Sequence, residues 1–267
     1  MTDPDSSLTE AEIRRFARHI VLPEIGGRGQ ARLLRARVLV IGAGGLGSPL
    51  LLYLAAAGIG TLGLVDDDRV EEANLQRQIV HDRSAVGRRK TESALARVAA
   101  LAPAARLVAH DVRLTVANAD RLVADYDLVA DGSDNAVTRA AVHDACLRQG
   151  RTLVSGAVQG MDGQLTTYKA HLGPPHPCLH CVFPSATTAQ GLPSCALAGV
   201  LGPAAGVIGT LQAVEVIKEL LGVGQSLSGR LLLYDAAAAS LDAVQLRRRD
   251  GCRQCRAYGE TPTFPEA

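Results

Sequence analysis

The sequence has little net charge and few lysines, and both shortages limit the partners that the protein can have. Lys90, Lys169 and Lys218 are its only lysines, and 28 basic against 27 acidic residues leave a net charge of +1. A nucleic-acid-binding surface or a polybasic membrane anchor needs a clear excess of basic residues. The composition therefore predicts a protein that binds neither nucleic acid nor a membrane surface.

Targeting and membrane-spanning segments are also missing from the pattern. The first ten residues, MTDPDSSLTE, are polar and acidic, unlike a signal peptide. An uncharged run at 196–214 is rich in Gly and Ala, contains Pro203 and Gln212, and is followed directly by charged residues. We interpret this run as a loop and a buried helix rather than a membrane span, and expect a cytoplasmic protein.

Apolar segments of strand length alternate with helical patterns over the first half of the chain. Strands are predicted at about 37–42, 61–66, 105–110, 127–131 and 152–156. Helices are predicted at about 45–58, 90–101 and after the SDN at 133–135. This alternation indicates an α/β fold with a mainly parallel, doubly wound, Rossmann-like sheet.

The rhythm changes after residue 156. GQLTTYK alternates like an antiparallel strand, and an apolar helix near 203–221 precedes two strands at about 230–234 and 240–247. We expect an N-terminal helical arm at 1–30, a nucleotide-binding half at 31–156 and a second half of the same domain at 157–267, with one sheet shared by both halves.

The N-terminal arm carries its own helix signal. Thr9 and Glu12 form a possible capping box that opens a helix. Its expected apolar face consists of Ile13, Phe16, Ala17 and Ile20. Three glycines are expected to break the chain before the first strand: Gly26, Gly27 and Gly29.

A glycine-rich turn follows the first predicted strand in VLVIGAGGLGSPL. Gly42, Gly44 and Gly47 form G-x-G-x-x-G at a helix start, where the backbone can approach a phosphate. Asp66, at the end of the second strand, is placed to bind ribose hydroxyls. The pattern favours nucleotide binding over a tight turn without a ligand, but it does not choose between NAD and ATP.

A cluster of cations after Asp66 favours ATP. It consists of Arg77, Arg83, Arg88, Arg89 and Lys90. A triphosphate with a leaving pyrophosphate needs this much positive charge, whereas a nicotinamide enzyme does not. We expect Arg77 and Lys90 to bind phosphate and the other three to be solvated surface charges.

Asp134 follows the fourth strand, where carboxylates face the ligand crevice of a parallel sheet. Beside a triphosphate, its simplest role is to hold Mg²⁺. The alternative is a helix N-cap formed by Ser133 or Asp134.

Four of the six cysteines form two Cys-x-x-Cys pairs: Cys178 with Cys181, and Cys252 with Cys255. Four thiolates favour a closed structural Zn²⁺ site over two disulfides or an iron–sulfur cluster. Cys195, before the long apolar helix, is either a nucleophile with a lowered pKa or a small buried apolar residue.

These motifs together resemble the MoeB/ThiF/HesA family, bacterial relatives of the ubiquitin-activating enzymes. The matching stretches are GAGGLGS at 42–48, NLQRQ at 74–78, GRRKTES at 87–93, SDN at 133–135 and the two cysteine pairs. The resemblance covers residues 10–256, and NLQRQ combined with the four cysteines is far more specific than the glycine motif.

The resemblance implies an adenylyltransferase that uses ATP and Mg²⁺. Its partner would be a small ubiquitin-like sulfur carrier ending in Gly-Gly, of the molybdopterin-synthase or thiamine type, which binds the 157–267 half. The carrier's terminal carboxylate attacks the α-phosphate, pyrophosphate leaves, and an acyl adenylate forms before thiocarboxylate formation.

The resemblance also assigns individual residues. Gly45 would lie against the nucleotide, and Arg18, in RRFARHI, would reach the partner subunit's site in a homodimer. The other implied nucleotide and phosphate ligands are Asp66, Asp68, Asn74, Arg77, Gln78, Lys90, Ser133, Asp134 and Asn135. Cys195 matches a cysteine that only some members use covalently.

Two departures from the family pattern and three other readings accompany this resemblance. Ala73 stands where relatives often have serine, and the chain ends at 267 without a rhodanese domain, so a separate cysteine desulfurase or rhodanese is expected as sulfur donor.

Three alternative functions stand beside sulfur-carrier adenylation. They are an enzyme that adenylates another carboxylate, such as one on a modified tRNA; an NAD or FAD oxidoreductase; and a non-catalytic scaffold.

Overall fold

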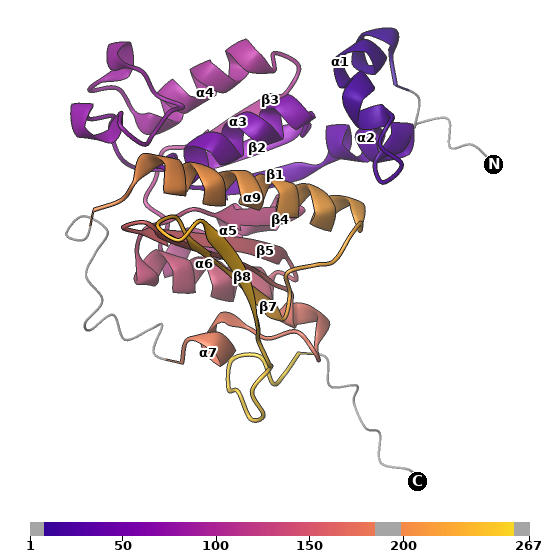
Figure 1. The fold of residues 1–267 in the computed structure, drawn as a ribbon, viewed down its shortest axis with the longest axis vertical. Helices are drawn as coiled ribbons and strands as arrows, with labels where there is room; N and C mark the ends of the chain where they lie inside the picture. The colour runs from indigo at the N-terminus through magenta and orange to yellow at the C-terminus, as the bar shows by residue number, and fades with distance from the viewer. Residues whose placement is uncertain (1–7, 185–198, 259–267) are drawn as a thin grey trace.

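One sheet forms the centre of the molecule, in a computed structural model that describes residues 8–184 and 199–258 (Figure 1). Its strand order is β3-β2-β1-β4-β5-β6-β7-β8. The strands are β1 (Arg37–Ile41), β2 (Thr61–Val65), β3 (Arg106–His110), β4 (Leu128–Asp131), β5 (Thr152–Gln159), β6 (Asp162–Tyr168), β7 (Arg230–Asp235) and β8 (Ser240–Gln245). Pairs from β3 to β5 are parallel and pairs from β5 to β8 are antiparallel, which confirms the predicted fold.

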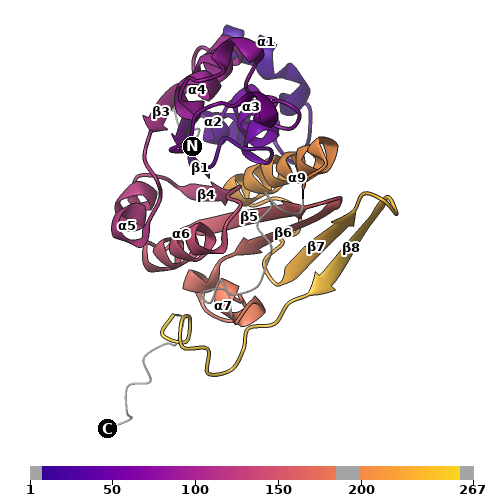
Figure 2. The same ribbon diagram turned by 90° about the vertical axis from the view of Figure 1, so that its left-hand side faces the viewer.

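Helices cover both faces of the sheet (Figure 2). The helices of the described residues are α1 (Glu10–Ile20), α2 (Gly26–Arg35), α3 (Gly47–Ala57), α4 (Lys90–Leu101), α5 (Val116–Ala124), α6 (Ala136–Arg148), α7 (Leu179–Val182) and α9 (Gly202–Leu221). In β1, Val38 and Val40 share a core with α3 and α9, whereas Leu39 and Ile41 share a core with α5 and α6. Burial on both faces explains why the central parallel strands β1 and β2 are mostly apolar.

Helix α1 begins as the sequence predicts but buries less of its apolar face. The Thr9 side chain accepts from the Glu12 backbone, and the Glu12 carboxylate accepts from the Thr9 backbone, so the capping box is confirmed. Phe16 is buried, but Ile13 is 47% exposed in the single chain and Ala17 is also exposed. The expected apolar face is therefore only partly covered by this chain.

Two of the longer helices were not predicted. The glycines at 26, 27 and 29 lie in the first turn of α2 rather than in a loop, and Gly26, with a φ of +59°, is where the helix begins. A Cβ at Gly29 would lie 3.2 Å from Ile25 Cγ2 and 3.5 Å from Leu221 Cδ1, so the close packing favours glycine there. Helix α5 follows a capping box formed by Thr115 and Asn118, a signal that the sequence does contain.

Helix α9 begins within the uncharged run and is the buried helix that the sequence predicts there. It lies against α3, β5 and β6, with Ala205, Ile208 and Val216 fully buried. Across the part of the chain that the structure describes, no helix has the length and apolarity to span a bilayer.

Candidate active site and metal centre

The turn between β1 and α3 requires glycine at positions 42 and 47 for steric reasons. Gly42 has a φ of +90°, which L side chains rarely adopt. A Cβ at Gly47 would lie 1.8 Å from the Gly42 carbonyl oxygen. The turn therefore closes tightly enough to place the backbone N–H groups of the α3 start at its opening, the arrangement that binds phosphate.

The middle glycines of this turn have different surroundings. A Cβ at Gly44 would meet no atom within 4 Å, so this residue borders open space. A Cβ at Gly45 would lie 3.1 Å from Ala205 Cβ and 3.5 Å from Arg77 Cγ. Close packing therefore favours glycine at position 45, because the missing side chain lets α9 and the aliphatic part of Arg77 approach the turn.

Asp66 lies at the carboxyl end of β2 beside the glycine turn. Its Oδ2 accepts from the Ala43 N–H at 2.8 Å and its Oδ1 accepts from the Asp68 N–H at 2.9 Å. Burial raises the pKa of Asp66, although the Lys90 charge and both hydrogen bonds oppose the shift. The carboxylate is thereby fixed at the position expected for a ribose ligand.

The predicted cations separate into two groups. Lys90 is buried at the start of α4, and its Nζ lies 2.8 Å from Asp68 Oδ2. Arg77 is half-buried, and its Nη1 donates to the Ala73 carbonyl at 3.2 Å. The other three form ion pairs at the surface: Arg83 with Glu72, Arg88 with Glu92, and Arg89 with Asp111.

Asn74 and Gln78, which flank Arg77 in the sequence, are both buried. Asn74 Oδ1 accepts from the Glu71 N–H at 3.1 Å and therefore holds the short helical turn before Arg77. Gln78 Oε1 has no hydrogen-bond partner within the described residues. Of these two side chains, Gln78 is therefore the one with an amide oxygen left for a ligand.

His81 was missed by the sequence analysis. Its ring is buried under the glycine turn, with Nε2 3.1 Å from the Ala43 carbonyl and Nδ1 2.9 Å from Ser93 Oγ. Burial lowers the pKa of His81, which favours a neutral ring that donates to the carbonyl. A lone histidine gives no sequence signal for this supporting role.

The loop that carries Asp134 is held from below by a buried polar network. Asp131 is fully buried, and its Oδ1 accepts from the Ser133 N–H at 2.9 Å. Arg139 Nη2 donates to the Ser133 carbonyl at 2.7 Å, and Gln212 Nε2 donates to the Asp131 carbonyl at 2.9 Å. Asp131, Arg139 and Gln212 were not singled out from the sequence as site residues, because buried polar partners of a loop leave no spacing pattern.

The alternative role of Ser133 or Asp134 as the cap of α6 is wrong. The N-cap is Asn135, whose Oδ1 accepts from the Thr138 N–H at 2.9 Å. Asp134 is exposed, and its carboxylate does not cap the N-terminus of α6. It is thus left available to a ligand.

The three loops meet at one edge of the sheet. The Gly132 N–H donates to the Ile41 carbonyl at 3.0 Å, and a Cβ at Gly42 would lie 3.3 Å from the Gly132 carbonyl oxygen. The carboxyl ends of β1, β2 and β4 therefore bring the glycine turn, Asp66 and the Asp134 loop together at this edge, which is where open α/β sheets have their ligand crevice.

Arg18 lies away from this crevice in its own chain. Phe16, two residues earlier, packs against Gly58 at the far end of α3 from the glycine turn. The 11 residues of α3 separate its ends by about 16 Å. Arg18 is exposed and does not join the site of the chain that carries it.

A small recess, with room for little more than a water-sized group, adjoins the supports of the Asp134 loop. It is lined by Arg139, Gly156, Ala157, Gln164, Thr166 and Phe183, among others. Arg139 connects the two places, because the same guanidinium that holds the Ser133 carbonyl forms one wall of the recess.

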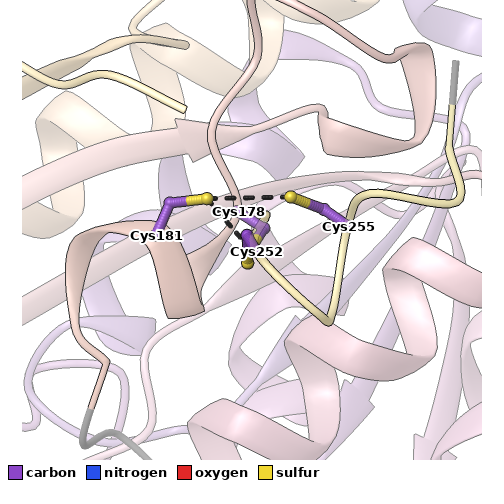
Figure 3. A group of neighbouring side chains, drawn as sticks. All are labelled: Cys178, Cys181, Cys252 and Cys255. Atoms are coloured by element: carbon purple, nitrogen blue, oxygen red, sulfur yellow. Dashed lines mark hydrogen bonds between the residues drawn. The ribbon is translucent and has the colours of Figure 1, made fainter. Parts of the chain in front are cut away.

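The four paired cysteines form one buried cluster (Figure 3). Sγ–Sγ distances are 3.6 Å for Cys178–Cys181, Cys178–Cys252 and Cys181–Cys255. Sulfurs at about 2.3 Å from a tetrahedral Zn²⁺ are roughly 3.8 Å apart, so the donor set fits this ion.

The electrostatics of the cluster also call for a cation. Burial and the neighbouring thiols raise the pKa of Cys178, and burial raises the pKa of Cys255 to about 11. A bound cation would be needed to hold all four as thiolates. The Arg249 N–H already donates to Cys181 Sγ at 3.4 Å. Cys195, expected to be either a nucleophile or a small buried residue, lies outside the described residues.

The chain is similar to one family of proteins along nearly its whole length. The family model described as the ThiF family matches residues 16–255. The chain is 51% identical to the adenylyltransferase and sulfurtransferase MOCS3 of Bos taurus over 98% of its own length, and spans only 57% of that relative. It is 46% identical to the sulfur carrier protein adenylyltransferase of Thermus thermophilus, covering 97% of this chain and 95% of that one.

A solved structure supports the fold alone. The chain superposes on E. coli MccB, crystallised with MccA-N7isoASN, with a TM-score of 0.79 over 94% of this chain and 76% of that one. The sequence identity is 18%. The names of the two sequence relatives contain the activity expected from the sequence, adenylyl transfer.

Proposed function

The chain belongs to the ThiF family, and from that premise we propose that it adenylates the C-terminal carboxylate of a small ubiquitin-like sulfur carrier. The observation that carries the proposal is the convergence of Asp66, Lys90 and the Asp134 loop on the glycine turn. The carrier ends in Gly-Gly, and the second substrate is ATP with Mg²⁺.

Each part of the crevice has a task in binding ATP. The N–H groups at the start of α3 bind phosphate, with Gly44 facing the open space that the nucleotide occupies. Asp66 binds the ribose, with Asp68 beside it holding Lys90. The remaining ligands surround the phosphates: Asn74, Arg77, Gln78, Lys90, Ser133 and Asn135.

The reaction needs charge neutralisation rather than a side-chain nucleophile. The carrier carboxylate attacks the α-phosphate, an acyl–phosphate bond forms, and the bond to pyrophosphate breaks. Arg77 and Lys90 offset the repulsion between the carboxylate and the polyphosphate. Asp134 would hold Mg²⁺, which would supply further neutralisation of the phosphate oxygens.

We place the carrier tail along the surface beside the recess next to Arg139. The wall of that recess includes Gly156 and Ala157. From there the carboxylate can reach the Asp134 loop, to which Arg139 is bonded.

The wider assembly is also part of the proposal. Arg18 serves the site of a second copy in a homodimer, which explains both its distance from its own crevice and the exposure of Ile13 on the same helix. Zn²⁺ occupies the four-cysteine cluster as a structural ion. Sulfur comes from a separate donor protein, and the reaction takes place in the cytoplasm.

The test is ATP–pyrophosphate exchange by the purified full chain. We expect labelled pyrophosphate to enter ATP only when a carrier ending in Gly-Gly is present, and a carrier lacking its last glycine to give no exchange. Absence of exchange with every carrier contradicts the proposal. Stimulation by tRNA, or a change in nicotinamide absorbance with any substrate, would support the competing activities instead.

Loss of one zinc ligand should be costly. We expect Cys252→Ser to lose its zinc and to lower the melting temperature by roughly 4–8 °C, because metal binding contributes folding free energy. Zinc content by elemental analysis and a thermal melt measure both effects. Cys146→Ala, at a buried cysteine outside the cluster, should keep about one zinc per chain. Retention of zinc by Cys252→Ser would contradict the assignment.

A further inference from the structure

A second group of polar side chains lies beside the four-cysteine cluster and has no part in the adenylation reaction. His143 and Asp144 come from α6, and His180 comes from α7, between two of the cysteines. Asp144 Oδ1 lies 2.9 Å from His143 Nδ1 and 2.9 Å from His180 Nε2. His143 Nε2 accepts from the Leu179 N–H at 3.0 Å.

These contacts fix the proton on His143. Because its Nε2 accepts from a backbone N–H, the proton of the neutral ring lies on Nδ1 and is donated to Asp144. The same carboxylate oxygen accepts from His180. Both nitrogens of His143 are thus used in hydrogen bonds, so the group is a closed hydrogen-bond network rather than an open set of metal ligands.

The network ties a very short helix to a long one. Helix α7 has four residues, too few to be stable by itself, and contains Cys181 next to its N-cap Cys178. His143 is buried and makes edge contacts with the rings of Tyr168 and His180, at 5.2 and 5.5 Å between centroids. The Leu179 N–H that it holds belongs to the residue directly after Cys178.

We propose that His143 is a positioning residue of the four-cysteine centre. With Asp144 it holds the Cys178–Cys181 segment against α6, so that two of the four sulfurs are already in place for the ion. This inference rests on the zinc site proposed above. It predicts that removing the two nitrogens of His143 speeds the loss of zinc without touching a ligand.

The experiment uses the full zinc-loaded chain and three variants. Zinc release to a chromogenic chelator is followed in wild type, His143→Phe, His143→Gln and, as a matched control, His110→Phe. His110 Nε2 lies 2.8 Å from the hydroxyl of the buried Tyr126, on the strand at the far edge of the sheet. We expect release from His143→Phe to be about 10–100 times faster than from wild type, and release from His110→Phe to be unchanged.

The glutamine variant separates positioning from packing. Phenylalanine preserves the aromatic volume of His143, whereas the glutamine amide oxygen can still accept from the Leu179 N–H. A positioning role predicts slower release from His143→Gln than from His143→Phe. A role in packing alone predicts the reverse order, and that order would overturn the proposal.

Two further results keep the proposal testable if His143→Phe does not fold. His180→Phe removes only one bond of the network, so we expect release a few times faster than in wild type, and an unchanged rate would overturn the proposal. Wild-type zinc content is measured first. Two zinc ions per chain would make the histidine group itself a metal site and would overturn the positioning role. No bound zinc would show that the four cysteines are not a metal centre and would overturn the proposal as well. Carrier-dependent exchange tests adenylation separately from both results.

Discussion

Asp134→Ala is expected to lower carrier-dependent ATP–pyrophosphate exchange about a thousandfold, because it removes the carboxylate that holds Mg²⁺ at the phosphates. The side chain is exposed at the crevice and is not the cap of α6, so its loss breaks no helix contact. We therefore expect the melting temperature to stay close to that of wild type. Exchange at saturating ATP, carrier and Mg²⁺ measures the effect.

A second aspartate provides the control for this substitution. The Asp120 side chain, on α5, is 44% exposed and forms an ion pair with Arg148 at the end of α6. Asp120→Ala should leave exchange within about twofold of wild type, since exposed ion pairs contribute little. Exchange by Asp134→Ala at the wild-type rate would show that magnesium is held elsewhere and would move the assignment to another residue of the crevice.

The contrast between Asp134 and its supports shows what the sequence could predict. Asp134 was found because its place at the end of a strand has a general meaning in parallel sheets. Asp131 and Arg139 hold the same loop from inside the protein, but their partners are backbone groups at 133 and 156. Contacts of that kind depend on the fold and leave no pattern along the chain.

The same distinction applies to the secondary structure. Strong periodicity placed α4 at 90–101, as observed, and the strands to within a few residues. The glycines of α2 were expected to break the chain, but Gly26 begins the helix at a positive φ and Gly29 packs against Leu221 of α9. His143 was passed over for a related reason: its two partners come from its own helix and from a segment 36 residues later.

Gly47→Ala is expected to destabilise the protein by roughly 3 kcal/mol, one of the largest effects of any single methyl group in this chain. The added Cβ would lie 1.8 Å from the Gly42 carbonyl oxygen, which is backbone and cannot rotate away. The β1–α3 turn would have to open, and the buried ends of both elements would separate. Chemical unfolding of the purified variant measures the loss.

Gly44→Ala, in the same turn, should have the opposite profile. Its Cβ would meet no protein atom within 4 Å, so we expect stability within about 0.5 kcal/mol of wild type. If the open space is where the phosphates lie, the methyl group blocks their approach to the backbone, and the KM for ATP should rise about tenfold or more. An unchanged KM in a folded Gly44→Ala would place the nucleotide elsewhere, whereas a raised KM with intact folding would assign the space above Gly44 to its phosphates. The pair of variants thus divides one motif into a residue that the fold requires and a residue that the ligand requires.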